Sequence, residues 1–342
     1  MSNPVSVCLG VLGVLAVLEA EPRSNVSRVT PGASPGARIA FASHRDGNWE
    51  IYVMDADGTR QTRLTSRPEQ DRFPLWSPDQ SQLAFGSQVG TGWQLWVMNA
   101  DGTNPRAVAS HISAKGGRAW SPDGSRVVLS ANVDGNVEIL SVTTDGKAPV
   151  NLTNAAGDDR DPTWSADGRH IAFSSTRSGK AAIYIMRADG SNVRRLTDDT
   201  AASEAPAFAP DGSAIAFVSH RDSVGDLYLV RLDGAQVRRL TVGAHATRDQ
   251  LRWSPDGSHI AFQAAHAANH DLDLVRVADI RHTQLAATAG YDGMCSWSPD
   301  SRSIAFISDR DSVSSLYLSG VTAGSARRLT MTNTLNPAFS PD

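Results

Sequence analysis

Charged and amide side chains recur in this chain a few residues ahead of a repeated aromatic residue. They are Asp71, Arg72, Lys115, Asp159, Asp161, Glu204, Arg248, Asp249, Asp292 and Asn336. Carboxylates that converge from several segments repel one another and raise one another's pKa unless positive charge lies between them. Such a group would attract a cation, a cationic peptide segment or a sugar. These ten residues are therefore the candidate binding site, if the fold brings them together.

The aromatic residue belongs to a tetrapeptide, usually Trp-Ser-Pro-Asp, that occurs seven times. The copies begin at Trp76, Trp120, Trp164, Phe208, Trp253, Trp297 and Phe339. Successive copies are 44, 44, 44, 45, 44 and 42 residues apart. A period of about 40–45 residues is typical of one four-stranded blade of a β-propeller.

Each period contains the signals of antiparallel strands joined by tight turns. Ser-Pro-Asp-Gly suits a type I turn, because proline already has the φ angle that the second position requires. A large-small-large segment follows, such as Ile171-Ala172-Phe173, and then a third apolar segment, such as Ile183-Tyr184-Ile185. Asp189-Gly190 suits a hairpin, and Arg195-Leu196-Thr197 is predicted to be the fourth strand. The repeats show no helical periodicity.

The two ends of the repeat region predict a closed ring. The strand at Ile39 has no aromatic anchor before it, and the anchor at Phe339 has no strand after it. We therefore expect Asn336 to Phe339 to pair beside the strands that begin at Ile39, which removes exposed sheet edges. The prediction is an all-β, seven-bladed β-propeller with four antiparallel strands per blade. An open solenoid, or a six-bladed ring with one decayed repeat, is the alternative.

The repeats resemble those of the TolB-like β-propeller family, which carry the same Trp-Ser-Pro-Asp-Gly, Ile-Ala-Phe, Ile-Tyr and Arg-Leu-Thr pattern. The resemblance covers residues 39 to 342. TolB proteins carry an additional α/β domain before a six-bladed propeller, and the 38 residues ahead of Ile39 are too few to form one. The resemblance implies a propeller used mainly for binding, often outside the cytoplasm.

In such a ring the segment before each anchor lies at the upper mouth of the central channel, beside the connections between second and third strands. Those connections contain Arg45, Arg177, Arg221 and Arg310. One interpretation makes the mouth a polar funnel for a ligand. In the other, each loop arginine pairs with a carboxylate of an adjacent blade and holds the ring together. Residues that break the repeat, such as Lys115, Arg248 and Asp292, are the better binding candidates.

Catalytic motifs are scarce. The one Gly-x-Ser-x-Gly match, Gly32 to Gly36, lies in the predicted linker and not between a predicted strand and a helix, so it does not indicate a nucleophile elbow. The sequence has no P-loop or dinucleotide fingerprint, and no catalytic residue and no cofactor is predicted. His266 and His270, followed by Asp271 and Asp273, lie in a divergent repeat; an irregular connection is favoured over a metal site there, because the segment is not a predicted helix. Some oligogalacturonate lyases are seven-bladed propellers with related repeats and a His-bound metal. A carbohydrate-active lyase with a metal in the funnel is therefore the alternative function.

The N-terminal region differs from the repeats. The apolar run Val5 to Leu18 has the length of a signal-peptide core and is too short to span a membrane. We expect residues 1–20 to be a signal peptide or N-terminal anchor, 21–38 a linker and 39–342 the propeller, in a periplasmic or secreted protein. Removal of the signal would leave only Cys295, which is interpreted as a small buried hydrophobic residue.

The overall charge narrows the choice of partner. With 32 Lys and Arg against 36 Asp and Glu, the net charge is −4, which disfavours nucleic acid because phosphate binding needs concentrated basic surface. The expected partner is a protein or peptide, with a saccharide or a cation as the other ligand classes. The chain is expected to be a monomer without a transmembrane domain.

Overall fold

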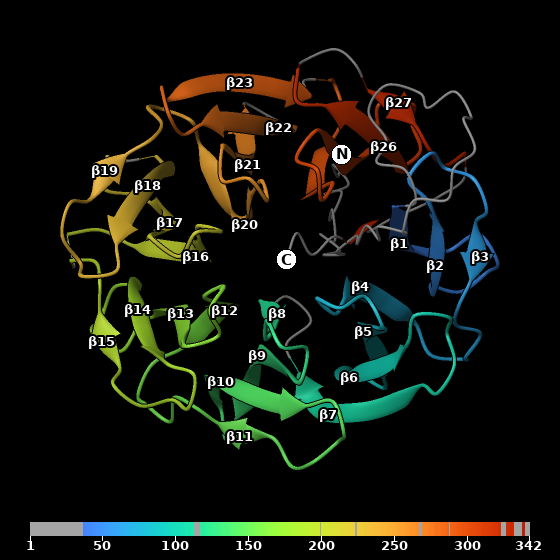
Figure 1. Cartoon of the computed structure of the whole chain (residues 1–342), viewed down its shortest axis with the longest axis horizontal. Helices are drawn as coiled ribbons and strands as arrows, with labels where there is room; N and C mark the ends of the chain where they lie inside the picture. The colour runs from blue at the N-terminus through green and yellow to red at the C-terminus, as the bar shows by residue number, and fades with distance from the viewer. Residues whose placement is uncertain are drawn as a thin grey trace, which may run out of the picture.

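The computed structural model describes residues 37–112, 117–198, 200–222, 224–266, 269–286, 288–322, 326–331 and 337–338. These residues form sheets arranged like blades around a central axis (Figure 1). Each of the seven blades has four antiparallel strands, and a bridge between Ile112 and Ala131 joins the second blade to the third. The predicted all-β, seven-bladed propeller is confirmed.

The strands follow one another from the inside of each blade to the outside. Blade 1 contains β28 (Pro337–Ala338), β1 (Arg38–Ser43), β2 (Glu50–Asp55) and β3 (Thr62–Arg63). Blade 2 contains β4 (Asp71–Trp76), β5 (Gln82–Val89), β6 (Gly92–Asn99) and β7 (Arg106–Ile112). Blade 3 contains β8 (Arg118–Trp120), β9 (Arg126–Val133), β10 (Asn136–Thr143) and β11 (Val150–Asn151). Blade 4 contains β12 (Asp159–Trp164), β13 (His170–Ser175), β14 (Ala182–Arg187) and β15 (Arg194–Arg195).

The remaining blades repeat this order. Blade 5 contains β16 (Ser203–Phe208), β17 (Ala214–Ser219), β18 (Asp226–Arg231) and β19 (Arg238–Arg239). Blade 6 contains β20 (Ala246–Trp253), β21 (His259–His266), β22 (Asn269–Arg276) and β23 (Arg281–Ala286). Blade 7 contains β24 (Asp292–Trp297), β25 (Ser303–Ser308), β26 (Ser315–Gly320) and β27 (Arg327–Arg328).

The Ser-Pro-Asp-Gly turns are fixed by side-chain as well as backbone hydrogen bonds. In blade 4 the Gly168 amide donates to the Ser165 carbonyl at 2.9 Å, as a type I turn requires. The Ser165 hydroxyl donates to Asp167 at 2.6 Å and accepts the His170 amide at 2.9 Å. The turn therefore delivers the chain from the inner strand into the second strand.

Packing between blades uses the large-small-large pattern of the second strand. Phe173 is fully buried and stacks on Tyr184 of the third strand, with ring centroids 5.8 Å apart. Ala172, on the opposite face, belongs to a cluster with Phe208 and Phe217 of blade 5. The small side chain thus lets the next blade approach closely, as side-chain alternation along a strand predicts.

The fourth strands are shorter than predicted. In blade 4 the strand is β15 (Arg194–Arg195), and Leu196 and Thr197 follow it. Thr197 still joins the blade, because its hydroxyl accepts the Ile183 amide at 2.9 Å. The same threonine-to-amide bond occurs at Thr65, Thr153, Thr241 and Thr330.

The ring closes where the two ends of the chain meet. β28 pairs with β1 through Ala40 with Ala338 and Phe41 with Pro337. The predicted closure of the first blade is therefore confirmed, although Asn336 and Phe339 lie outside the described residues. The proposed signal segment and nearly all of the linker also lie outside them. No helix fit to cross a membrane occurs in the described part of the chain.

Candidate binding site at the channel mouth

The inner strands begin at one end of the channel, here called the upper mouth. Four of them, β4, β12, β16 and β24, start with a bulge of one extra residue, and β20 has a longer register shift. In β12, Asp159 and Arg160 pair with Ser175 and Ser174, and the register then shifts before Thr163. The residues in these bulges adopt left-handed backbone angles without being glycine: Phe73, Asp161, Ala205 and Met294, with φ of 60°, 55°, 53° and 50°. Such backbone persists only where the surrounding structure holds it.

Backbone packing also brings neighbouring inner strands together. A Cβ atom on Gly117 would lie 2.7 Å from the Cα of Asp161 in the next blade, so no larger residue fits there without movement. The Asp161 amide donates to the Ser130 hydroxyl at 3.2 Å, which links blades 3 and 4 a second time. Blades 3 and 4 are therefore closely packed at the upper mouth.

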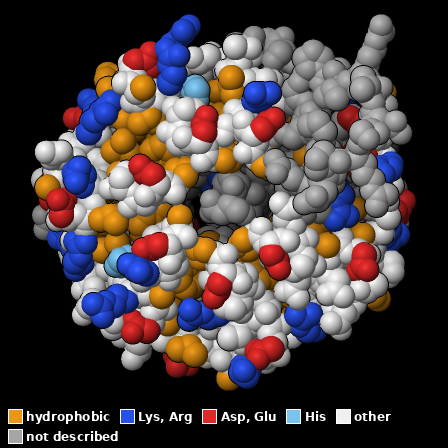
Figure 2. All heavy atoms as spheres, in the orientation of Figure 1, with side chains coloured by type: hydrophobic (Ala, Val, Ile, Leu, Met, Phe, Trp, Pro, Cys, Tyr) orange, Lys and Arg blue, Asp and Glu red, His pale blue; other side chains and the backbone are white. Residues whose placement is uncertain are grey.

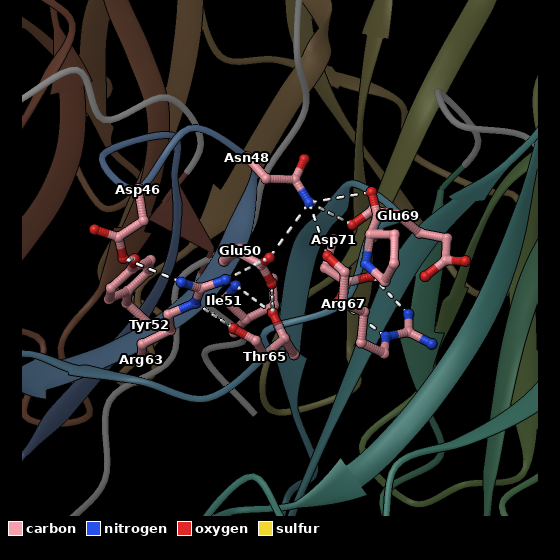
Figure 3. Close-up of polar contacts among 11 residues, drawn as sticks. Asp46, Asn48, Glu50, Ile51, Tyr52, Arg63, Thr65, Arg67, Glu69 and Asp71 are labelled. Atoms are coloured by element: carbon pink, nitrogen blue, oxygen red, sulfur yellow. Dashed lines mark hydrogen bonds and ion pairs between the residues drawn. The ribbon is translucent and has the colours of Figure 1, made fainter.

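Three of the predicted carboxylates are fully buried, and each lies against an arginine. Asp71 pairs with Arg67 at 2.7 Å (Figure 3), and two further pairs, Arg177 with Asp159 at 2.7 Å and Arg310 with Asp292 at 2.8 Å, repeat the arrangement. Each of these carboxylates therefore already has a positive charge beside it, as the interpretation with paired loop arginines expected. In blades 4 and 7 the partner arginine comes from the same blade, not from an adjacent one as that interpretation had it, whereas Arg67 lies in the connection from blade 1 to blade 2.

Several contacts fix the position of the loop arginine in blades 4 and 7. The Arg177 Nε donates to the Ser175 hydroxyl at 2.8 Å, and its guanidinium lies 5.0 Å from the Tyr184 ring centroid. Arg310 repeats this arrangement on Ser308 and Tyr317. Burial raises the pKa of the Asp159 carboxyl, although Arg177 acts in the opposite direction. In each pair the arginine guanidinium therefore supplies the hydrogen bonds and the positive charge that water would otherwise provide to the buried carboxylate.

A second layer of carboxylates, at the start of the third strands, was not predicted. Glu50 accepts hydrogen bonds from Arg63 at 2.7 Å and from the Thr65 hydroxyl at 2.6 Å (Figure 3). Asp226 accepts from Arg239 and Thr241 in the same way. The recurring Arg-Leu-Thr was the signal in the sequence, because its arginine and its threonine both donate hydrogen bonds to this carboxylate in these blades.

The other predicted residues have different surroundings. Asp161 accepts the Ser174 hydroxyl at 3.2 Å, and Glu204 lies half-buried on β16. Arg248 and Asp249 lie on β20, and the structure describes their backbone only. Lys115 and Asn336 lie outside the described residues. The strand order brings Asp71, Arg72, Asp159, Asp161, Glu204 and Asp292 to the same end of the ring.

Arg72 differs from the paired arginines. Its guanidinium lies 4.5 Å from the centroid of the Trp49 ring, and its Nη2 donates to the Gln70 side chain at 2.5 Å. Its Nε is buried without a hydrogen-bond partner. Burial lowers the pKa of Arg72 to about 10, so the side chain remains cationic at neutral pH. No carboxylate pairs with it in the described part of the chain.

Arg118, on β8, is a second arginine of this kind, and it is not among the predicted site residues. Its guanidinium lies 5.2 Å from the centroid of the Phe73 ring, and its Nη1 is buried without a hydrogen-bond partner. Burial lowers the pKa of Arg118 to about 10. The signal was its departure from the repeat, since Pro74, Pro162 and Pro206 occupy the equivalent position two residues before the anchor.

The histidines of blade 6 gather around one aspartate. Buried Asp273 lies 2.7 Å from His282 Nε2 and 3.3 Å from His266 Nε2, and it takes the register position that Tyr184 has in blade 4. His270 instead lies beside the Tyr291 ring. Within the described ranges no group of three His, Cys, Asp or Glu residues is arranged to hold a metal ion.

Two further features lie apart from the mouth residues. Cys295 is buried, and burial raises its pKa to about 12, which agrees with its interpretation as an unreactive core residue. A cavity of about 500 Å³ is lined by outer parts of blade 4, including Ile185, Arg187 and Arg194. None of the predicted site residues lines it. On the face drawn in Figure 2, acidic and basic side chains alternate over the coloured part of the ring, without a large patch of one sign.

Comparison with known proteins assigns the chain to a family. The family described as the TolB beta propeller domain matches residues 21–115, 106–203 and 249–342. Among curated proteins none matches the chain. TolB from Acinetobacter baumannii is a similar solved structure, with 21% identity and a TM-score of 0.58 over 72% of this chain and 62% of that one.

Two enzymes have the same propeller fold. An oligogalacturonate lyase in complex with manganese has 20% identity and a TM-score of 0.68 over 83% of this chain and 85% of that one. A puromycin-hydrolyzing peptidase of Mycobacterium tuberculosis has 16% identity and a TM-score of 0.68, over 89% of this chain but 53% of that one. At these identities the likeness is one of fold. On its sequence repeats and its matched residues, this chain belongs to the TolB β-propeller domain family.

Proposed function

We propose that this propeller is an exported, monomeric binding scaffold that holds a protein or small ligand at the upper mouth of its channel. The apolar run Val5 to Leu18 supports export, with residues 1–20 as signal or anchor, 21–38 as linker and 39–342 as the propeller. Membership of a propeller family supports a binding role, because a propeller presents a rigid ring whose specificity comes from a few rim residues.

The contrast between the two ends of the inner strands carries the proposal. At the lower turns the serine hydroxyl donates to the aspartate in nearly identical geometry, at 2.6 Å for Ser77, Ser165, Ser254 and Ser298. At the upper mouth the equivalent positions hold Asp71, Asp159, Ser203 and Asp292, followed by Arg72, Arg160, Glu204 and Gly293. A ligand without sevenfold symmetry needs residues that break that symmetry, and these lie at the upper mouth.

The proposal is tested by capture of partners from an envelope extract. The full chain is immobilised beside a variant with Asp161→Asn and Glu204→Gln, which removes two mouth charges that are not in the buried arginine pairs. A variant with Asp101→Asn and Asp189→Asn, in exposed lower hairpins, is the control. We expect the mouth variant to lose the captured partner and the control to keep it. The same capture by all three proteins would refute a site at the upper mouth.

The alternative is a carbohydrate-active lyase with a metal in the funnel. The likeness in fold to an oligogalacturonate lyase in complex with manganese favours it over other enzyme classes. Metal analysis of the purified chain, followed by a polyuronide-cleavage assay with added manganese, separates the two functions. Cleavage above the level of a heat-inactivated sample would establish the lyase.

A further inference from the structure

We propose that a groove at the lower end of blade 4 binds a small phosphate monoester. This lower groove is the cavity of about 500 Å³, and the residues that line it include His170, Ile185, Arg187, Asn192, Val193 and Arg194. Its volume is within the range of about 300–1,000 Å³ that is usual for small-molecule sites. The groove lies at the opposite end of the blade from the upper mouth, so the inference goes beyond the proposed function.

The strand register places three basic side chains on one face of blade 4. His170 and Arg187 are ladder partners across β13 and β14, which lie side by side with β15 (Figure 1). Ile185, two residues before Arg187 and therefore on the same face, is the ladder partner of Arg194. Directly opposite residues have Cβ atoms about 5 Å apart, and diagonal ones roughly 7–8 Å. The three side chains can therefore reach one ligand.

This combination occurs in blade 4 alone among the described strands. The residues at the same three register positions in the other blades are Arg38, Asp55 and Thr62; Gln82, Asn99 and Arg106; Arg126, Thr143 and Val150; Ala214, Arg231 and Arg238; His259, Arg276 and Thr283; and Ser303, Gly320 and Arg327. Contacts that hold a repeat protein together recur from repeat to repeat. Three basic residues in a single blade point to a ligand instead.

The junction with blade 5 has a smaller anchor than the others. The inner strand of blade 5 ends in Phe208, whereas the other inner strands of blades 2 to 7 end in tryptophan. Phe208 belongs to the same buried cluster as Ile185, which lines the lower groove. A phenylalanine fills less space than a tryptophan, so an open groove at this junction agrees with the change of anchor.

The basic side chains of the groove are accessible to a ligand. Arg187 and Arg194 are exposed, and His170 is half-buried. The side chains of His170 and Arg187 make no hydrogen bond or ion pair with any described residue. Arg194 Nη2 donates to the Leu232 carbonyl of blade 5, which fixes the side of the groove that Arg194 forms.

No carboxylate is among the described residues that line the groove. Two aspartates nearby are held within their own turns: Asp189 accepts the Ser191 hydroxyl at 2.6 Å, and Asp167 accepts the Ser165 hydroxyl at 2.6 Å. Hydrogen bonds from Ser191, and more weakly the charge of Arg187, lower the pKa of the Asp189 carboxyl. These aspartates offset part of the basic charge but leave the groove open to an anion.

A phosphate monoester matches the groove better than a carboxylate. A phosphoryl group carries a charge of about −1.5 to −2 at pH 7 and three acceptor oxygens, which suits donors that approach from three residues. A carboxylate has one charge and two oxygens, which a single arginine can satisfy. Ile185 and Val193 offer apolar surface to the rest of the ligand. Two sources share this chemistry, a phosphorylated small molecule in solution and the phosphomonoester headgroup of a lipid.

Binding measurements on the full chain test the site with defined probes. Calorimetric titration compares phenyl phosphate with phenyl sulfate and phenol, and sedimentation with phosphatidylcholine vesicles, with or without phosphatidate, is the lipid arm. We expect phenyl phosphate to bind about tenfold more tightly than the singly charged sulfate, and phenol not to bind. Binding of phosphatidate vesicles without binding of phenyl phosphate would support the site and assign the lipid as its source. Binding of neither monoester, or equal binding of phosphate and sulfate, would overturn the proposal.

Substitutions locate the binding. Arg187→Gln should weaken the monoester about tenfold, and Arg187→Lys should restore part of the affinity. His170→Gln is a second variant and should also weaken binding. Arg231→Gln is the matched control, because Arg231 has the same register position in blade 5, opposite Ala214. Arg187 and Arg231 are exposed, so both variants should melt with the parent. An equal effect of Arg187→Gln and Arg231→Gln on binding would refute a site in blade 4.

The two proposals fail in different ways. The variant with Asp161→Asn and Glu204→Gln should bind the monoester as the parent does, because its substitutions lie at the upper mouth. If the monoesters never bind but capture of the envelope partner depends on that variant, the groove is wrong and the binding scaffold stands. If capture is the same in all variants but monoester binding depends on Arg187, the scaffold proposal is wrong and the groove stands.

Discussion

The loop arginines show how one side chain can serve packing and electrostatics together. Arg177 lies over Phe173 and Tyr184 and binds Asp159, a carboxylate with no exposed surface. The arginine side chain itself is 19% exposed, so the pair is neither a surface ion pair nor fully enclosed. What matters for stability is the buried partner, because a carboxylate in the interior needs a compensating charge.

Arg177→Ala should therefore destabilise the protein strongly. Loss of the arginine leaves Asp159 buried and uncompensated, and we expect the free energy of unfolding to fall by about 3 kcal/mol. Arg160→Ala is the control, because its ion pair with Asp158 is 40% and 39% exposed and should contribute less than about 1 kcal/mol. Urea titration of both variants measures the difference. Similar losses of unfolding free energy in the two variants would show that the buried ion pair stabilises the protein no more than the exposed one.

Two histidines should give opposite pH dependence. The hydrogen bond from His282 to Asp273 raises the pKa of His282, whereas burial lowers the pKa of His259. The stabilisation from His282 is thus complete below the unfolded pKa of about 6.5 and is lost as pH rises through the folded value. The stabilisation from His259 is present above about 6.5 and is lost as pH falls through its folded value.

Urea titrations between pH 5 and pH 8.5 separate the two histidines. The stability difference between the parent and His282→Gln should shrink as pH rises. The difference between the parent and His259→Gln should grow in the parent's favour over the same range. A parallel pH dependence in the two variants would contradict the assignment of the hydrogen bond to Asp273.

At the scale of the blade, the aromatic anchor joins neighbouring sheets. Trp164 ends the inner strand of blade 4, is 5% exposed and belongs to a cluster with Val128 and Ile139 of blade 3. Its position follows from the turn after it, which fixes where the strand ends. The anchor therefore packs between two blades, whereas the turn joins two strands of the same blade.

Trp164→Ala should leave a cavity between blades 3 and 4. We expect a loss of about 3–5 kcal/mol in the free energy of unfolding, measured by chemical denaturation. Val193→Ala, at a side chain that is 37% exposed, is the control and should change stability by less than about 0.5 kcal/mol. A loss below about 1 kcal/mol for Trp164→Ala would mean that the anchor is not part of the core.

At the scale of the whole molecule, closure makes the ring a single unit. The pairing of β28 with β1 gives blade 1 its inner strand, and β28 also lies near β24 and β4 of the neighbouring blades. A ring without that strand would expose unpaired backbone on β1, which is a template for aggregation. The two ends of the chain thus depend on each other, although they are far apart in sequence.

Deletion of residues 333–342 should open the ring, because it removes β28. We expect loss of the monomer in size-exclusion chromatography and a lower melting temperature. Deletion of residues 341–342 leaves β28 intact and serves as the control. If the longer deletion melts within a few degrees of the parent, a change of the size expected for a surface effect, closure through β28 does not hold the ring.

The sequence alone determined the period, the strand order, the turns and the closure of the ring. These follow from local signals, because Ser-Pro-Asp-Gly, Asp-Gly and the alternation in segments such as Ile171-Ala172-Phe173 act over a few residues and then repeat. The fourth strands were predicted one or two residues late, because Thr197 joins the blade through its side chain and not through the strand ladder.

Only the tertiary structure decided which charges at the mouth are neutralised. Arg177 and Asp159 are 18 residues apart, and their contact depends on the pairing of two strands and on a stacked tyrosine. Arg118 and Gly86 lie in different blades, and a Cβ atom on Gly86 would lie 3.4 Å from Arg118 Nη1, so their fit is invisible until the ring is assembled. Local periodicity specifies the strands. Whether a charged side chain is buried and paired depends on residues that are distant in sequence and that only the fold brings together.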